Sequence, residues 1–142
     1  MLTGWVIYSG KVPLEWERGQ QNAANTGIDL KMIDPALIEI CLGPDNETHI
    51  YYEGTKKTFP DFLYLCTMKD HHYNALALML EMEKHNIPCV NPKDAVMAAN
   101  DKFLCSQLLS KAGLPFPRTV LVNGEESIPA IREIGRASCR ER

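Results

Sequence analysis

Two lysines in this chain stand where a cation could meet an anionic ligand. Lys102 follows Asn100 and Asp101, either of which can cap a helix, and so falls in the first turn of a predicted helix. The helix dipole disfavours a cation at that end by roughly 0.3–1 kcal/mol. An anionic partner would offset this cost, which makes Lys102 a candidate contact for an anion, although an exposed lysine without a partner is the more common case.

The second lysine, Lys11, follows Ser9 and Gly10 in a loop after the first predicted strand. Such loops contact phosphate in several nucleotide-binding folds, but neither G-x-G-x-x-G nor G-x-x-x-x-G-K-[ST] occurs here. From the residues alone, a solvated Lys11 and a core Trp16 are the preferred interpretation.

Histidines and cysteines give no metal-site pattern. His71 and His72 are adjacent, with Cys66 and His85 nearby, but neighbouring side chains on a helix point about 100° apart and do not easily share one ion. We therefore interpret them as exposed polar residues and predict no metal ligands. The cysteines before residue 133 contain no C-x-x-C pair, which favours reduced, mostly buried thiols: Cys41, Cys66, Cys89 and Cys105.

These residues would be positioned by strands that alternate with helices. An apolar run, 5–8, predicts a buried strand, and 13–26 predicts a helix that rests on a sheet through Trp16, Gln20 or Gly19, and Ala23. Further strands are predicted at 28–33, 62–66 and 87–90, and a hairpin within 49–59 that turns at Gly54. Helices are predicted at 70–85 and from 91. A capped helix is predicted from 101, where Gly113 ends it and a strand follows that ends at 122.

This order predicts an α/β fold with a parallel sheet and helices on both faces. A ligand would then bind at the carboxyl ends of the strands, near Ser9–Lys11 and near Thr67–Asp70. In the helix from 101, Phe103, Leu104, Leu108 and Leu109 form the predicted buried stripe.

Composition and charge exclude several classes of protein. A hydrophobic content of 45% with 23% charged residues is that of a globular chain. The formal charge of −3 and the lack of a basic stripe argue against a nucleic-acid partner. Since no apolar run is long enough for a membrane span or a secretion signal, we predict a cytoplasmic protein without a membrane partner.

The best-patterned segment resembles the junction of an ATP-grasp ligase, and the similarity is strongest to the RimK-like glutamate ligases. It combines Asn91-Pro92-Lys93-Asp94-Ala95 with Asn100-Asp101-Lys102-Phe103 and with Leu108-Leu109-Ser110-Lys111-Ala112-Gly113-Leu114-Pro115-Phe116-Pro117. The opening segment 4–10 and the segment 61–64 are similar to the same family. The resemblance covers about residues 1–122 and depends mainly on 90–119.

The resemblance implies a Rossmann-like pre-ATP-grasp domain over 1–95 and the start of an ATP-grasp domain over 96–132. It implies a ligase that uses ATP and Mg²⁺ to convert a carboxylate into an acyl phosphate, from which an amine then displaces the phosphate. The partners would be a glutamate-like amino acid and an unknown acceptor. Lys102 matches the first ATP-binding lysine of the family and would contact phosphate. The loop of Lys11 would face the acceptor side, which gives Lys11 and Trp16 a speculative substrate role.

The last ten residues, 133–142, can be back-translated into a sequence that resembles a sequencing adapter, so we expect them to be non-native. The remaining ATP and Mg²⁺ contacts of the family would lie beyond residue 132, and we expect the chain alone to be inactive. The alternative is a stand-alone flavodoxin-like binding or regulatory domain, in which Asp29 or Asp34 would matter. The helix and strand of 101–122 would be an unexplained appendage on such a domain.

Overall fold

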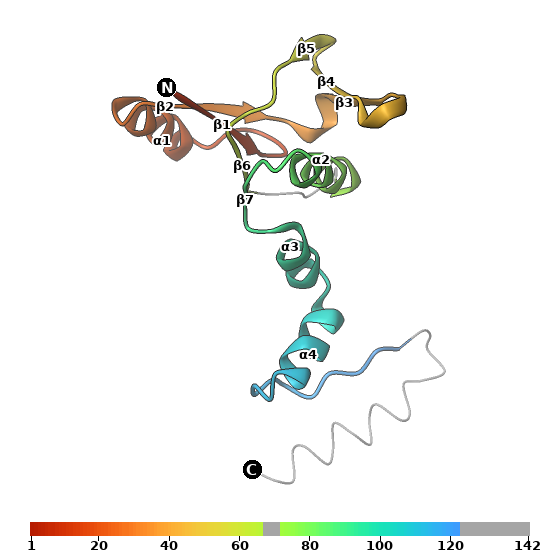
Figure 1. Cartoon of the computed structure of the whole chain (residues 1–142). Helices are drawn as coiled ribbons and strands as arrows, with labels where there is room; N and C mark the ends of the chain where they lie inside the picture. Colours follow the sequence, from red (N-terminus) through yellow and green to blue (C-terminus); the bar gives the residue numbers. More distant parts are fainter. Residues whose placement is uncertain (67–71, 123–142) are drawn as a thin grey trace. The chain divides into compact units, whose positions relative to one another are not determined.

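The computed structural model of the chain describes residues 1–66 and 72–122 (Figure 1). The chain divides into two compact units, Met1–Ala95 and a second unit that begins at Val96. Two β-sheets lie in the first unit, and the second contains the helix α4 (Lys102–Lys111). No helix in the described ranges is long and apolar enough to cross a membrane.

The larger sheet is parallel and has four strands in the order β2-β1-β6-β7. The predicted strands at its centre are confirmed as β1 (Leu2–Ile7) and β6 (Phe62–Leu65), flanked by β2 (Ile28–Ile33) and by the short β7 (Cys89–Val90). Trp5, Val6 and Ile7 are buried because β1 has a neighbouring strand on both sides and is covered on both faces.

Two crossover helices cover this sheet. The step from β1 through α1 (Leu14–Asn25) to β2 runs one way along the sheet, and the step from β6 through α2 (His72–Lys84) to β7 runs the other way. Right-handed crossovers in opposite directions place the two helices on opposite faces, as Figure 1 shows. The predicted parallel α/β fold is confirmed.

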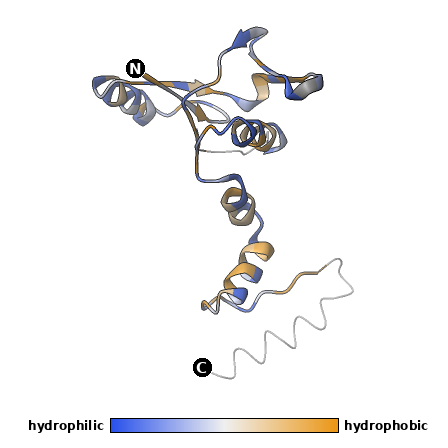
Figure 2. Cartoon of the chain, viewed as in Figure 1, coloured by the Kyte–Doolittle hydropathy of each residue, from blue (hydrophilic) through white to orange (hydrophobic). Residues whose placement is uncertain are grey.

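Helix α1 contacts the sheet through a narrow stripe. The partly covered residues are those predicted to face the sheet: Trp16, Gly19, Gln20 and Ala23. Every other residue of the helix is exposed. The helix is accordingly coloured mostly hydrophilic in Figure 2. The Gln20 amide also donates a 2.8 Å hydrogen bond to the Leu30 carbonyl of β2, which ties the helix to the edge of the sheet.

Helix α2 supplies much of the core of the first unit. It is described from His72, because residues 67–71 lie outside the described ranges. Leu78, Met79 and Met82 are fully buried, as expected for a helix whose middle is apolar. Leu80 is 53% exposed, however, so the apolar middle of the helix is open on one side.

The second sheet is antiparallel, with the strand order β3-β4-β5. The predicted hairpin is confirmed as β4 (Thr48–Tyr52) and β5 (Thr55–Lys57), which turn through Glu53 and Gly54. The sequence did not predict β3 (Ile38–Leu42), which lies between the short helices η1 (Pro35–Leu37) and η2 (Pro44–Asn46). β3 becomes a strand by pairing with β4, a partner that comes after a turn.

The second unit confirms the predicted helix and corrects its surroundings. After α3 (Lys93–Asn100), the Asp101 carboxylate caps α4 by accepting hydrogen bonds from Phe103 and Leu104. Leu114 N–H donates to Leu109 and Gly113 N–H to Ser110, and Gly113 has φ +67°, the geometry of a Schellman stop.

The strand expected at the end of this unit is not formed. Residues 114–122 are irregular and exposed, because no strand in the described residues pairs with them. The predicted buried stripe of α4 is also wrong: Phe103, Leu104 and Leu109 are only half-buried, and Leu108 is 46% exposed. Exposure of apolar residues such as Leu108 and Val120 is expected of a unit that lacks its packing partner.

Candidate functional site

The carboxyl edge of the parallel sheet is the first candidate site. β1 and β6 are adjacent and parallel, and their crossovers leave in opposite directions, so the strand order reverses between them. Ligands in such sheets bind at this reversal, outside the carboxyl ends of the strands. The loop Ser9–Lys11 emerges there beside Cys66, whose N–H donates a 3.0 Å hydrogen bond to the Ile7 carbonyl. The other predicted segment, Thr67–Asp70, lies outside the described residues.

Two polar side chains of this loop have no partner within the described ranges. The hydroxyl of Ser9 is buried and makes no hydrogen bond there. Lys11 is exposed and forms no ion pair with another described residue. A hydroxyl and an ammonium group in one short loop can together bind an anionic or hydrogen-bonding ligand.

An aromatic and thiol cluster supports the same edge. The rings of Trp16 and Tyr64 lie 5.9 Å apart and tilted, which anchors α1 on β6. Burial raises the pKa of the Cys66 thiol, and a hydrogen bond with the Trp16 side chain partly opposes that shift. A thiol that holds its proton is a poor nucleophile, so Cys66 fits packing rather than catalysis.

Lys102, the other predicted ligand contact, lies in the second unit as the first residue of α4. Its side chain is exposed and makes no ion pair with a described residue, so the ammonium group is available to an anion. The Asp101 cap holds the start of the helix, with 3.0 Å to the Phe103 nitrogen and 2.9 Å to the Leu104 nitrogen. This donor chemistry fits a phosphate contact.

Within 1–66 and 72–122, no group of three His, Cys, Asp or Glu side chains could hold a metal ion. His72 is exposed, as predicted for a polar surface residue, and His71 lies outside the described ranges. His85 differs from that prediction, because its ring is half-buried and lies 4.5 Å from the Phe59 ring. No described residue is therefore assigned to Mg²⁺.

Sequence reasoning missed a groove of about 370 Å³ in the first unit, between α2 and β3. Its lining is mostly apolar, with one carboxylate and one amide: Ile38, Ile40, Leu42, Tyr73, Asn74, Ala77, Leu80 and Glu81. The groove was missed because one of its walls is β3, a strand that was not predicted. The alternation of Ile38, Ile40 and Leu42 with Glu39 and Cys41 was the available signal.

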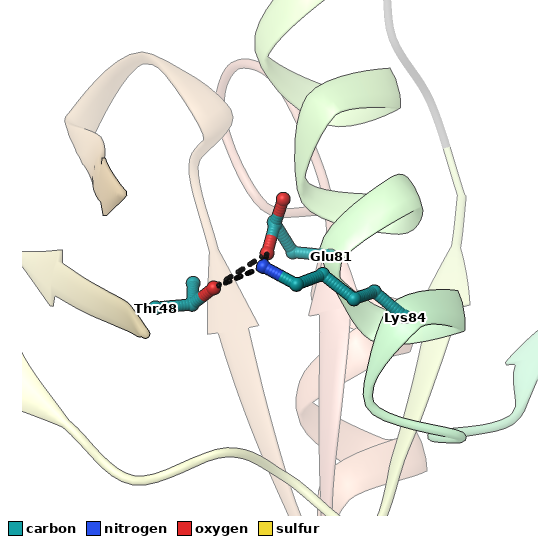
Figure 3. A network of polar contacts seen from close by, with 3 residues as sticks. All are labelled: Thr48, Glu81 and Lys84. Carbon is teal, nitrogen blue, oxygen red and sulfur yellow. Dashed lines mark hydrogen bonds and ion pairs between the residues drawn. The ribbon is translucent and has the colours of Figure 1, made fainter. Parts of the chain in front are cut away.

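A buried polar network fixes one wall of this groove (Figure 3). Glu81 accepts a 2.7 Å hydrogen bond from the Thr48 hydroxyl of β4, and Lys84 lies 3.3 Å from the same carboxylate oxygen and 3.0 Å from Thr48. Thr48 and Glu81 are each 8% exposed. The network therefore joins the antiparallel sheet to α2.

Comparisons with known proteins agree on one class of enzyme. The sequence is 31% identical over 96 residues to the tetrahydromethanopterin:alpha-L-glutamate ligase of Methanocaldococcus jannaschii, a match that covers 66% of this chain and 31% of that protein. It is 26% identical over 129 residues to a probable alpha-L-glutamate ligase of Pasteurella multocida, covering 80% of this chain and 39% of that protein. No family model matches the sequence.

Solved structures give the same fold. The ATP-grasp ligase PsnB, in complex with a minimal precursor, matches with a TM-score of 0.63 and 20% identity over 94% of this chain and 50% of that chain. The macrocyclase MdnB from Microcystis aeruginosa matches with a TM-score of 0.60 and 13% identity over 96% of this chain and 58% of that chain.

The sequence is thus similar to alpha-L-glutamate ligases, and the fold is similar to that of ATP-grasp ligases. The chain spans 31% and 39% of the length of these curated relatives and about half of the solved ligases.

Proposed function

We propose that this chain is the amino-terminal part of a cytoplasmic, RimK-like ATP-dependent carboxylate–amine ligase. The supporting observation is that the sequence matches alpha-L-glutamate ligases while the fold independently matches ATP-grasp ligases. Under this proposal, residues 1–95 are the pre-ATP-grasp domain, residues 96–132 begin the ATP-grasp domain, and residues 133–142 are non-native.

The chemistry requires activation of a carboxylate, because its oxide is a poor leaving group. ATP, with Mg²⁺ to neutralise phosphate charge, supplies that activation, and an amine then forms the amide. The Lys102 ammonium would contact an ATP phosphate, since it is exposed, positively charged and held at the start of a capped helix. Ser9 and Lys11 would lie on the substrate side, where a glutamate-like amino acid or its acceptor binds.

The described residues supply only part of such a site. They hold one candidate phosphate contact and no group of three side chains suited to a metal. We therefore expect residues 1–132 alone neither to bind ATP at micromolar concentration nor to form an amide. Calorimetry with ATP and Mg²⁺, and a mass-spectrometric assay for glutamate addition, check this; micromolar binding or ATP-dependent ligation would contradict it.

The ligase assignment itself is tested by sequencing the source DNA beyond codon 132. An open frame of about one further domain, with a glycine-rich loop and late Asp, Glu and Asn residues, would support the ligase. A stop codon there would support a stand-alone binding domain instead. With the longer protein in hand, Lys102→Ala should weaken ATP binding, whereas Lys111→Ala, at the other end of the same helix, serves as the matched control.

A further inference from the structure

The outer edge of β3 is an unpaired strand edge with an apolar surface beside it. We propose that two copies of this chain associate through this edge, with β3 of one copy antiparallel to β3 of the other and centred on Cys41. This surface lies in the first unit and includes neither Lys11 nor Lys102.

The hydrogen bonds to β4 show which backbone groups face outward. The Glu53 N–H donates to Leu37 at 3.2 Å, and the Gly43 N–H donates to Glu47 at 2.8 Å. Odd-numbered residues of β3 therefore exchange hydrogen bonds with β4, since such pairs alternate along an antiparallel ladder. The N–H and C=O groups of Ile40 and Leu42 point away from β4.

The accessible part of the edge fixes the register. Ile38 is only 8% exposed, whereas Leu42 is 62% exposed and Cys41 is exposed, so pairing is available toward the carboxyl end of β3. Centring the pair on Cys41 places Ile40 opposite Leu42 of the second copy, so that both exchange their outward hydrogen bonds. Glu39 then faces Gly43 of the second copy, and no like charges are opposed.

The surroundings of β3 fit a second copy. Ile40 and Leu42 line the groove against α2, where Tyr73 is 81% exposed and Leu80 is 53% exposed. Pairing of the two strands would join the two grooves and cover part of this apolar surface. Burial of apolar area is the usual source of association energy.

The other strand edges carry protection that β3 lacks. The edge of β2 has the Asp29–Lys31 ion pair, at 3.5 Å, and the Gln20 amide on its Leu30 carbonyl. β5 is a three-residue strand with two lysines, and β7 has only two residues. Charges, covering groups and short length are the devices that keep edges from pairing. Among the described strands, β3 has an outer edge of five residues that carries only one charged residue, Glu39, and no ion pair or covering side chain that involves a described residue.

The first test is the association state of the chain of residues 1–142, measured by sedimentation equilibrium under reducing conditions. We expect a dimer in the micromolar range, and Leu42→Lys should raise its dissociation constant by about tenfold or more. Leu14→Lys is the matched control, because Leu14 is 63% exposed on α1 and should leave the dimer unchanged. A monomeric chain, or a dimer insensitive to Leu42→Lys, would overturn the proposal; the latter would point to the exposed apolar residues of the second unit.

The second test determines the register of the strand pair in the unsubstituted chain. Residues that face each other in a non-hydrogen-bonded antiparallel pair have Cα atoms about 4.5 Å apart, within the range of a disulfide. Mild oxidation with diamide, which accepts the two electrons and two protons of a pair of thiols, should link Cys41 to Cys41 of the second copy. Peptide mapping identifies the bond, and Cys41→Ser should abolish it. Cross-links confined to other cysteines would refute this pairing.

Discussion

The hydroxyl of Thr48 donates a 2.7 Å hydrogen bond to the carboxylate of Glu81, and both residues are almost completely buried. One residue belongs to β4 and the other to α2, 33 positions later in the chain. Lys84 completes the network from the same helix. The pair fixes the antiparallel sheet against α2, because separating them would leave a buried carboxylate with only one of its two donors.

Thr48→Val should therefore destabilise the first unit. The substitution keeps the shape of the side chain but removes a donor to Glu81 and an acceptor for Lys84, at an expected cost of about 1–3 kcal/mol in the free energy of unfolding. Urea denaturation followed by circular dichroism measures this change. Thr55→Val is the matched control, since Thr55 is exposed on β5. An equal effect of the two substitutions would show that the buried network does not stabilise the fold.

Gly4 should tolerate no side chain. A Cβ at this position of β1 would overlap the Phe62 ring of β6 and lie 2.8 Å from the Leu30 side chain of β2. We expect Gly4→Ala to lower the free energy of unfolding by about 1–3 kcal/mol through overpacking. Gly19→Ala should have the opposite sign and stabilise α1 by about 0.5–1 kcal/mol, because the nearest atom to its Cβ is 3.8 Å away. Thermal unfolding of both variants distinguishes the two cases; a neutral Gly4→Ala would mean that Phe62 can move aside.

Asp101 should control the start of α4 and thereby the position of Lys102. Asp101→Ala removes the acceptor for two N–H groups and should cost about 0.5–2 kcal/mol of helix stability. Hydrogen exchange at Phe103 and Leu104 should accelerate, while Asp101→Ser, which retains a capping oxygen, should restore much of the protection. Unchanged exchange in Asp101→Ala would indicate that the cap contributes little.

Two thiols should make stability decrease at alkaline pH. Burial raises the pKa of Cys66 and of Cys89, and in Cys89 the nearby charge of Glu83 adds to the effect. The unfolded chain therefore loses thiol protons at a lower pH than the folded chain, so the free energy of unfolding falls as the pH rises through the ordinary thiol value of 9.0. Below that pH the contribution is fully present.

Urea unfolding in reductant, at neutral pH and at a pH above the thiol range, checks this expectation. Replacing both Cys66 and Cys89 by Ala should make the alkaline decline shallower than in the unsubstituted chain. Cys41→Ala is the control and should leave the decline as it is, because Cys41 is exposed. Peptide-resolved alkylation should also label Cys41 before the other two. A decline of the same size in the double variant would assign it to other groups.

Local patterns predicted the elements that form from their own residues. The apolar run 5–8, the stripe of Trp16, Gln20 and Ala23, and the cap and stop of α4 each depend on neighbours within a few turns of chain. The carboxyl-edge position of Ser9–Lys11 also followed from the sequence, because parallel strands that alternate with helices end at one edge. The proposed roles of Lys11 and Lys102 stay predictions.

Only the tertiary structure decided which segments found partners far along the chain. β3 is a strand because β4 pairs with it. The apolar residues before 122 form no strand, because none of the described strands pairs with them. Thr48 and Glu81 show no pattern in the sequence that would bring them together. The β3–β4 pairing and the Thr48–Glu81 hydrogen bond each join two segments of the chain, and the pattern of one segment does not name its partner.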